Sequence, residues 1–312
     1  MIDEYVLTPD VFDRSSYSRP DYIDMCLPYL KDVLYNDALV RDLRDGDWSK
    51  WCSEPTRLGS SHRLAKEILR KLKQRNRLRS FPRQSSGSSP NAVDWCQEAL
   101  ASHLKSPLTG VIVTYSEKRN FNAEPMIASI EKLPGCNWWQ ARSCSAMLER
   151  TTESFLGALQ KILDCANSLM FIDPNLDPTN NYSEFFRLLE PLQRRMPRPR
   201  IELHRSFCLG DGRHRRILSQ PQGTELFKPL DEKLKFFGLR AEVHFWQDFH
   251  ARFLITDLIG ILAEAGFDTT LTKQRTTWAR LSSVDRDKIQ RDFDPAVRPG
   301  DLKFQFPIGA TE

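Results

Sequence analysis

The second half of the chain alternates short apolar runs with longer amphipathic ones, and this alternation limits the possible fold more than any other feature. A buried-strand run, Leu169 to Asp173, follows a helical pattern over 143–166. Further strand-like runs occur at 200–204, 240–246, 251–256 and 258–263, with helical patterns at 185–192 and 230–237. Such alternation is typical of layered α/β domains. We therefore expect residues 143–312 to form an α/β domain, with a layered mixed sheet flanked by helices.

The first 142 residues show a different pattern, in which helical periodicity dominates. Apolar side chains are spaced for helices over 22–34, 61–72 and 92–104. One short β-rich run, Val111 to Tyr115, is the only strand expected there. The serine-rich stretch 84–90 has the composition of a linker. The sequence thus predicts a mainly helical, basic N-terminal region over 1–142.

Composition excludes several classes of protein. Apolar residues make up 40% of the chain and charged residues 28%, and no run of 18 apolar residues occurs that could span a bilayer. Asp3 and Glu4 stand where a secretory signal would need a basic start. The seven cysteines are scattered and form no Cys-x-x-Cys pair, so we expect free thiols in a cytoplasmic protein, with no structural zinc, other metal or cofactor.

Basic residues are concentrated in two segments, although the net charge is only +4. Between Arg57 and Arg83, ten basic residues face one acid, Glu67. Clustered cations bind phosphate-rich polymers, so we expect nucleic-acid contacts from Arg63, Lys66, Arg70, Lys71, Lys73, Arg75 and Arg77. A second cluster contains Arg194, Arg195, Arg198, Arg200, Arg205, Arg213, Arg215 and Arg216. The alternative for each segment is a solvated helix face or loop.

One short polar motif follows the strand pattern at 240–246. It contains His250-Ala251-Arg252, four further residues and Asp257, with Gly266-Phe267-Asp268-Thr269 after it. This spacing resembles the phospholipase D superfamily, whose pattern is His-x-Lys, four residues and Asp, followed by Gly-Ser/Gly-x-Asn. The strand 169–173 is similar to the opening strand of such a domain. The resemblance covers the C-terminal 170 residues or so and nothing before them.

The resemblance implies a metal-independent phosphodiester chemistry. His250 would be the nucleophile that forms a phosphohistidine, or the acid that protonates the leaving oxygen. Arg252 would hold the phosphoryl oxygens through its fork of N–H donors. Asp257 would support neighbouring groups rather than react. Gly266, Asp268 and Thr269 would support phosphate binding.

The chain contains this motif once, whereas a complete site of the family has two. The family therefore implies a homodimer that joins two copies of His250, which we favour, or a degenerate second half within the chain. His204 and His244 are the internal candidates, although His244 alternates along a strand as a structural residue would.

Two main functions follow from the resemblance. The first is a phosphodiesterase, most simply a nuclease acting as a homodimer in a prokaryotic defence or mobile-element system. The second is a catalytically degenerate module that binds nucleic acid or a partner protein as a subunit of a larger complex. Arg252 in place of lysine and the missing asparagine keep this second alternative open. A lipid-active phosphodiesterase is a third alternative.

Overall fold

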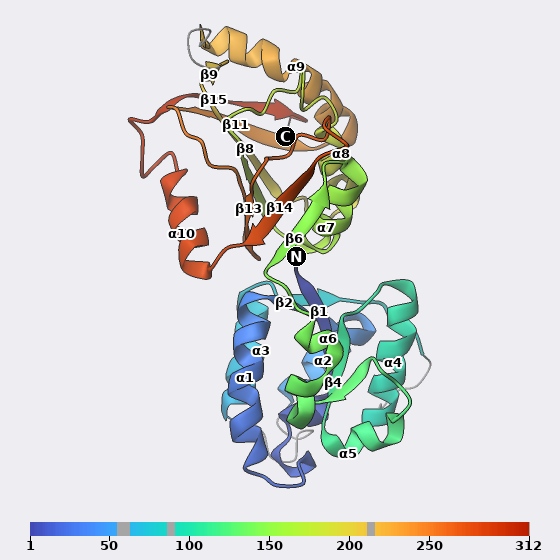
Figure 1. The fold of residues 1–312 in the computed structure, drawn as a ribbon. Helices are drawn as coiled ribbons and strands as arrows, with labels where there is room; N and C mark the ends of the chain where they lie inside the picture. The colour runs from blue at the N-terminus through green and yellow to red at the C-terminus, as the bar shows by residue number, and fades with distance from the viewer. Residues whose placement is uncertain (55–62, 86–90, 211–215, 312) are drawn as a thin grey trace. The chain divides into compact units, whose positions relative to one another are not determined.

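The computed structural model describes residues 1–54, 63–85, 91–210 and 216–311. The chain divides into two compact units, one of residues 2–142 and one that runs from Ser143 to the C-terminus and includes Met1. The division falls at the boundary expected from the sequence. Both units are α/β (Figure 1).

The unit of residues 2–142 is built on a parallel sheet of five strands in the order β3-β2-β1-β4-β5. The prediction of a single strand in this region is therefore wrong, although helices still make up most of its regular structure. Most of these strands are too short to produce a clear apolar pattern, and three-residue strands leave almost none. Their bounds are β1 Asp3–Leu7, β2 Ala38–Asp42, β3 Leu78–Ser80, β4 Gly110–Val113 and β5 Ile127–Ser129.

The helices of this unit cover both faces of the sheet, with α1 and α3 together on one side and α4 on the other (Figure 1). The helices expected near 22–34 and 92–104 are present, and the one expected over 61–72 is described from Arg63 onward. The α-helices are α1 Tyr22–Asn36, α2 Leu43–Ser53, α3 Arg63–Gln74, α4 Ala92–Lys105, α5 Tyr115–Lys118 and α6 Asn137–Gln140. The 3₁₀ turns are η1 Pro9–Phe12, η2 Arg14–Ser16, η3 Arg119–Phe121 and η4 Ile130–Gly135.

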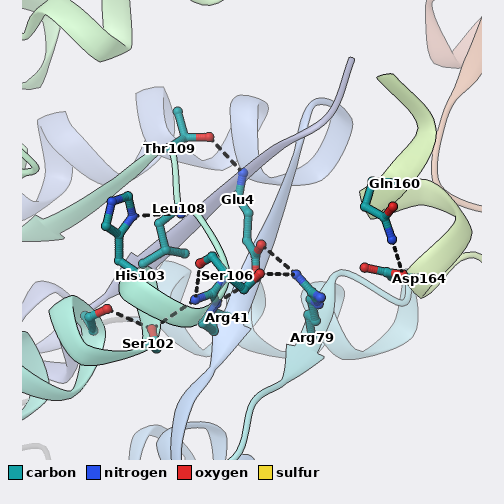
Figure 2. A network of polar contacts seen from close by, with 11 residues as sticks. Glu4, Arg41, Arg79, Ser102, His103, Ser106, Leu108, Thr109, Gln160 and Asp164 are labelled. Carbon is teal, nitrogen blue, oxygen red and sulfur yellow. Dashed lines mark hydrogen bonds and ion pairs between the residues drawn. The ribbon is translucent and has the colours of Figure 1, made fainter. Parts of the chain in front are cut away.

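A buried ionic network ties β1 to its neighbours. Figure 2 shows the fully buried Glu4 accepting from Arg41 Nε at 2.8 Å and from Arg79 Nη1 at 3.0 Å. Arg41 Nη1 also donates to Ser102 Oγ and to the Ser106 carbonyl, both at 3.0 Å. Buried charges need such partners, so this network holds β1, β2, β3 and the end of α4 in one arrangement. Arg79 of the first basic segment is therefore used within the protein.

The C-terminal unit contains an eight-stranded mixed sheet in the order β15-β11-β8-β7-β12-β13-β14-β6. Strands β7, β8 and β11 are parallel, and every other neighbouring pair is antiparallel. The strands are β6 Ser145–Glu149, β7 Ser168–Ile172, β8 Arg200–Ser206, β11 Arg240–Trp246, β12 Phe253–Thr256, β13 Gly260–Ala263, β14 Arg275–Arg280 and β15 Leu302–Gly309. A separate hairpin joins β9 Cys208–Leu209 to β10 Arg216–Ile217. The helical pattern expected from Ser143 is wrong at its start, which is β6.

Helices cover both faces of this sheet as well. Phe171 of β7 packs edge-on against Phe185 and Phe267 on one face. On the other face, Ile172 belongs to a buried cluster against which Ile289 of α10 packs. Burial of these side chains on both faces accounts for the continuous apolar run of β7. The helices are α7 Thr152–Cys165, α8 Phe186–Leu189, α9 Gln220–Phe237 and α10 Ser283–Asp292, with the 3₁₀ turn η5 Glu190–Arg194.

Candidate functional site

The polar motif lies at the edge of the mixed sheet where β7, β8 and β11 end. These three strands are parallel, so their carboxyl ends meet at one edge. Strand β12 runs antiparallel to β7, with Phe253 opposite Ile172, and therefore begins at this same edge. His250 and Arg252 directly precede β12, and Asp173 directly follows β7. Ligand sites of open α/β sheets form at carboxyl edges of this kind.

Arg252 faces a buried carboxylate at this edge. Its Nε lies 3.6 Å from Oδ1 of Asp173, which is fully buried, while 28% of the Arg252 side chain is exposed. Its Nη1 also lies 3.5 Å from the carbonyl oxygen of Glu264. The guanidinium is thus anchored on one side and open to solvent on the other, an arrangement suited to binding an anion.

Asp173 is held by donors from three segments. It accepts hydrogen bonds from the Tyr182 hydroxyl at 2.6 Å and from the backbone N–H groups of Asn175 and Phe267 at 3.0 and 3.3 Å. Burial raises the pKa of Asp173, and these donors together with Arg252 oppose that rise. Burial also raises the pKa of Tyr182, which therefore remains a neutral donor. Sequence analysis did not assign a role to Asp173 or Tyr182, and the only signal was an acid at the end of a buried strand.

Gly266 fits closely against the Asp173 and Arg252 pair. It has a φ of 72°, and a Cβ at this position would collide with Oδ2 of Asp173 and approach Cδ of Arg252 to 2.9 Å. Only glycine both adopts this positive φ readily and fits in the available space. The structure thus brings Gly266, His250 and Arg252 to the same edge.

Asp268 and Thr269 follow the Gly266 turn and lie inside the protein. Asp268 is buried and forms an ion pair with Nη2 of Arg150 at 2.7 Å. Thr269 is also buried, and its hydroxyl lies 3.4 Å from the hydroxyl of Thr152. The two residues therefore attach the Gly266 turn to the start of α7, and their support of phosphate binding stays a prediction.

Asp257 lies at the opposite end of β12 from Arg252. Its Oδ1 accepts hydrogen bonds from the backbone N–H groups of Asn167 at 2.8 Å and Ser168 at 3.3 Å, where β7 begins. The side chain supports the pairing of β7 with β12. The structure does not bring Asp257 together with His250.

His250 is exposed, whereas His204 and His244 are buried. The two buried rings belong to β8 and β11 and stack with their centroids 4.5 Å apart. Trp246 Nε1 donates to His204 Nδ1 at 2.8 Å. Burial lowers the pKa of His204, and burial with the charge of His204 lowers the pKa of His244 to about 4. Both rings are buried within the sheet, so neither is open to a substrate as His250 is.

The first basic segment divides into exposed and structural residues. Arg63, Lys66, Arg70 and Lys73 are exposed on α3, and Lys71 is half-buried. Arg75 lies over the Tyr35 ring at 5.0 Å. Arg77 is buried and donates to the carbonyl oxygens of Ala38 and Asn36, both at 3.3 Å, so the prediction that it contacts nucleic acid is wrong.

Several residues of the second basic cluster are occupied within the protein. Arg195 donates to the Ala166 carbonyl at the end of α7, and Arg198 donates to the Gly238 carbonyl at the end of α9. Arginines commonly satisfy the free carbonyls of helix ends in this way. Arg205 is buried, which lowers its pKa to about 10. Arg213 and Arg215, like residues 86–90 of the expected linker, lie outside the described residues.

The part of the chain that the structure describes contains neither a metal-ligand cluster nor a membrane-spanning helix. In ranges 1–54, 63–85, 91–210 and 216–311, no group of three or more His, Cys, Asp and Glu side chains is placed to hold a metal ion. In the same ranges no helix combines the length and apolar character needed to cross a membrane.

Comparisons with known proteins give only a weak likeness to solved structures. No family model and no curated protein matches the chain. Among solved structures, the chain is similar to TrmBL2, an archaeal chromatin protein with a novel mode of DNA binding, at 10% identity and a TM-score of 0.30. The match covers 77% of this chain and 81% of that one. A TM-score of this size does not establish a common fold.

Proposed function

We propose that the C-terminal unit is a phospholipase D-like phosphodiesterase, most simply a metal-independent nuclease. One observation carries the proposal: exposed His250 and the anchored guanidinium of Arg252 lie two residues apart at the carboxyl edge of three parallel strands. A nucleophile beside a fixed cation is the combination that attack on a phosphodiester needs.

In the proposed mechanism, His250 attacks phosphorus and the leaving oxygen takes a proton from a second histidine. Arg252 stabilises the charge on the phosphoryl oxygens, and Asp173 keeps its guanidinium in place. Within the described residues His250 is the exposed histidine of this unit, since His204 and His244 are buried. We therefore propose that the second histidine is His250 of another copy, related by a two-fold axis.

The second candidate is a recognition module that binds a phosphate group without cleaving it. The ion pair of Arg252 with Asp173 favours this alternative, because the carboxylate offsets part of the positive charge that catalysis would use. Both candidates use the same residues, but only the phosphodiesterase cleaves the phosphodiester that it binds.

The deciding experiment is cleavage of labelled single- and double-stranded DNA and RNA in EDTA, with retention on a gel scored in parallel. We expect EDTA-resistant cleavage that His250→Ala abolishes and that Gln247→Ala, an exposed change in the same loop, leaves intact. Binding without cleavage by the wild type would select the recognition module instead. A purified protein that is monomeric at micromolar concentration and fully active would contradict the dimer.

Nucleic-acid binding by the exposed cations of α3 has its own test. Each phosphate contact contributes about 0.9 to the slope of log affinity against log salt. Changing Arg63, Lys66 and Arg70 to glutamine should lower that slope by roughly 2 to 3 if all three contact phosphate. An unchanged slope would remove α3 from the interface.

A further inference from the structure

The parallel sheet of residues 2–142 reverses its direction of winding next to β1. The chain adds β2 and β3 on one side of β1 and then returns to place β4 and β5 on the other. At such a reversal the loops after the two central strands diverge and leave a crevice at the carboxyl edge. Here these loops follow β1 and β4, so ligand binding is expected beside them.

A cavity of about 490 Å³ lies beside these loops. Small-molecule sites commonly have volumes of about 300–1,000 Å³. Its walls contain exposed apolar surface, since Met25 is 70% exposed and Tyr115 is 41% exposed. The lining residues are Ser18, Tyr22, Met25 and Cys26 from the loop after β1 and the start of α1, Tyr115 after β4, and Glu131 and Lys132 after β5.

Glu131 supplies an acceptor that the described part of the protein leaves unused. Its Oε1 accepts the backbone N–H of Tyr115 at 3.1 Å, whereas Oε2 is buried with no hydrogen-bond partner among the described residues. Burial raises the pKa of Glu131. Burial, together with the charge of Glu131, also raises the pKa of Cys26 to about 11, so that thiol stays neutral. A buried acceptor without a donor is costly, and a ligand N–H that displaces the atoms covering Oε2 would satisfy it.

The same loops are unsuited to a phosphate group. Residues 8–21, which follow β1, contain no glycine and so lack the flexible turn that lets backbone N–H groups surround a phosphate. After β4, the N–H of Thr114 already donates to Asp10 Oδ2 at 3.0 Å, and the N–H of Tyr115 donates to Glu131. The carboxylates of Asp10 and Glu131 therefore already accept the N–H groups that a bound phosphate would need.

We propose that this cavity binds an uncharged heteroaromatic ring that carries an amino group, of the nucleobase or nucleoside class. The flat ring packs against Tyr22, Tyr115 and Met25, and its amino group donates to Glu131. Lys132, which also lines the cavity, holds its ammonium 4.5 Å from the centroid of the Tyr115 ring. This site is independent of the phosphodiesterase proposed for the C-terminal unit.

Calorimetric titration of the full chain with adenosine, guanosine, cytidine and uridine tests the proposal. We expect at least one of the three nucleosides with an exocyclic amino group to bind. Uridine should bind roughly tenfold more weakly or worse, because it has no amino group and its one ring N–H lies between two carbonyl oxygens that the Glu131 carboxylate repels. Adenosine 5′-monophosphate should bind more weakly than adenosine. Absence of binding by all four nucleosides, or a clear preference for the monophosphate, would overturn the proposal.

Substitutions in the cavity test whether the ligand binds there. Glu131→Gln keeps the acceptor for the Tyr115 N–H but turns an amide donor toward the ligand, and should weaken binding roughly tenfold or more. Tyr115→Ala should also weaken it, whereas Glu124→Gln, a carboxylate of the same unit outside the cavity, should bind as the wild type does. His250→Ala should bind normally and so separates this site from the phosphodiesterase. If Glu131→Gln and Tyr115→Ala, shown to be folded by circular dichroism, retain full affinity, the ligand does not bind in this cavity.

Discussion

At the carboxyl edge of each sheet a carboxylate lies beside the loops, but the two carboxylates differ in the partners that they have. In the mixed sheet, buried Asp173 is matched by Arg252, the Tyr182 hydroxyl and two backbone N–H groups. In the parallel sheet, one oxygen of Glu131 has no partner in the described residues, and the cavity beside it is open. The edge of the mixed sheet is closely packed and exposes the cation Arg252. The edge of the parallel sheet has a cavity and offers the acceptor Glu131. The two edges therefore suit ligands of opposite polarity.

The largest effect on stability should come from adding a side chain at Gly266, in the closely packed edge of the mixed sheet. Gly266→Ala places a Cβ against Asp173 at a positive φ, and we expect the free energy of unfolding to fall by about 3 to 4 kcal/mol. Gly135→Ala, near the open edge, has no atom within 4 Å of the added methyl and should change stability by less than about 1 kcal/mol. Urea denaturation of both variants measures the contrast. Equal losses would show that the edges do not differ in packing.

Removing the matched carboxylate should have the next largest effect. Asp173→Ala leaves the Tyr182 hydroxyl and two backbone N–H groups without their acceptor, and should lower the free energy of unfolding by about 3 kcal/mol. The matched control is Glu184→Gln, which affects an exposed ion pair with Arg187 and should cost at most about 1 kcal/mol. A loss no larger than the control's would mean that the network around Asp173 contributes little.

The two buried histidines give the C-terminal unit a pH dependence. The unfolded chain protonates His244 below its ordinary pKa of 6.5, but the folded protein does so only near 4. Stability from this residue is therefore present above pH 6.5 and is lost as the pH falls toward 4. The shift corresponds to at most roughly 3 kcal/mol, and we expect about 2 because His204 titrates beside it. His244→Phe should reduce the stability difference between pH 7 and pH 4; an unchanged difference would assign it to other groups.

The smallest effect, of opposite sign, is expected at Glu131. Its pKa is raised, so the folded protein holds this proton more tightly than the unfolded chain. Stability is then lost as the pH rises from about the ordinary value of 4.5 through the raised pKa. Glu131→Gln should remove this loss and change stability at pH 7 by no more than about 1 kcal/mol. Denaturation at pH 4 and pH 7 checks the sign of this pH dependence. A variant that loses stability mainly at pH 7 would show that ionised Glu131 stabilises the protein, contrary to this prediction.

The sequence predicted the strands that carry continuous apolar runs, such as β7 and β12, and missed several that are very short or alternate with polar residues, such as β3 and β15. Strand β7 was recognisable because both of its faces are buried, whereas β14, with arginine at each end, and three-residue β3 carry no such pattern. The motif spacing made His250 and Arg252 candidate site residues. It could not identify Asp173 as the partner of Arg252, because that contact depends on how β7 aligns with β12. Exposure likewise decides which arginines are free to bind a ligand, and Arg77 is buried.

The close fit of Gly266 against Asp173 and Arg252 limits how this protein can evolve. A side chain at position 266 has no room while the other two residues remain. Substitution there is viable only after position 173 or 252 has become smaller or moved. Among related sequences the three positions should therefore change together, and a retained glycine would indicate that the paired arginine is retained as well.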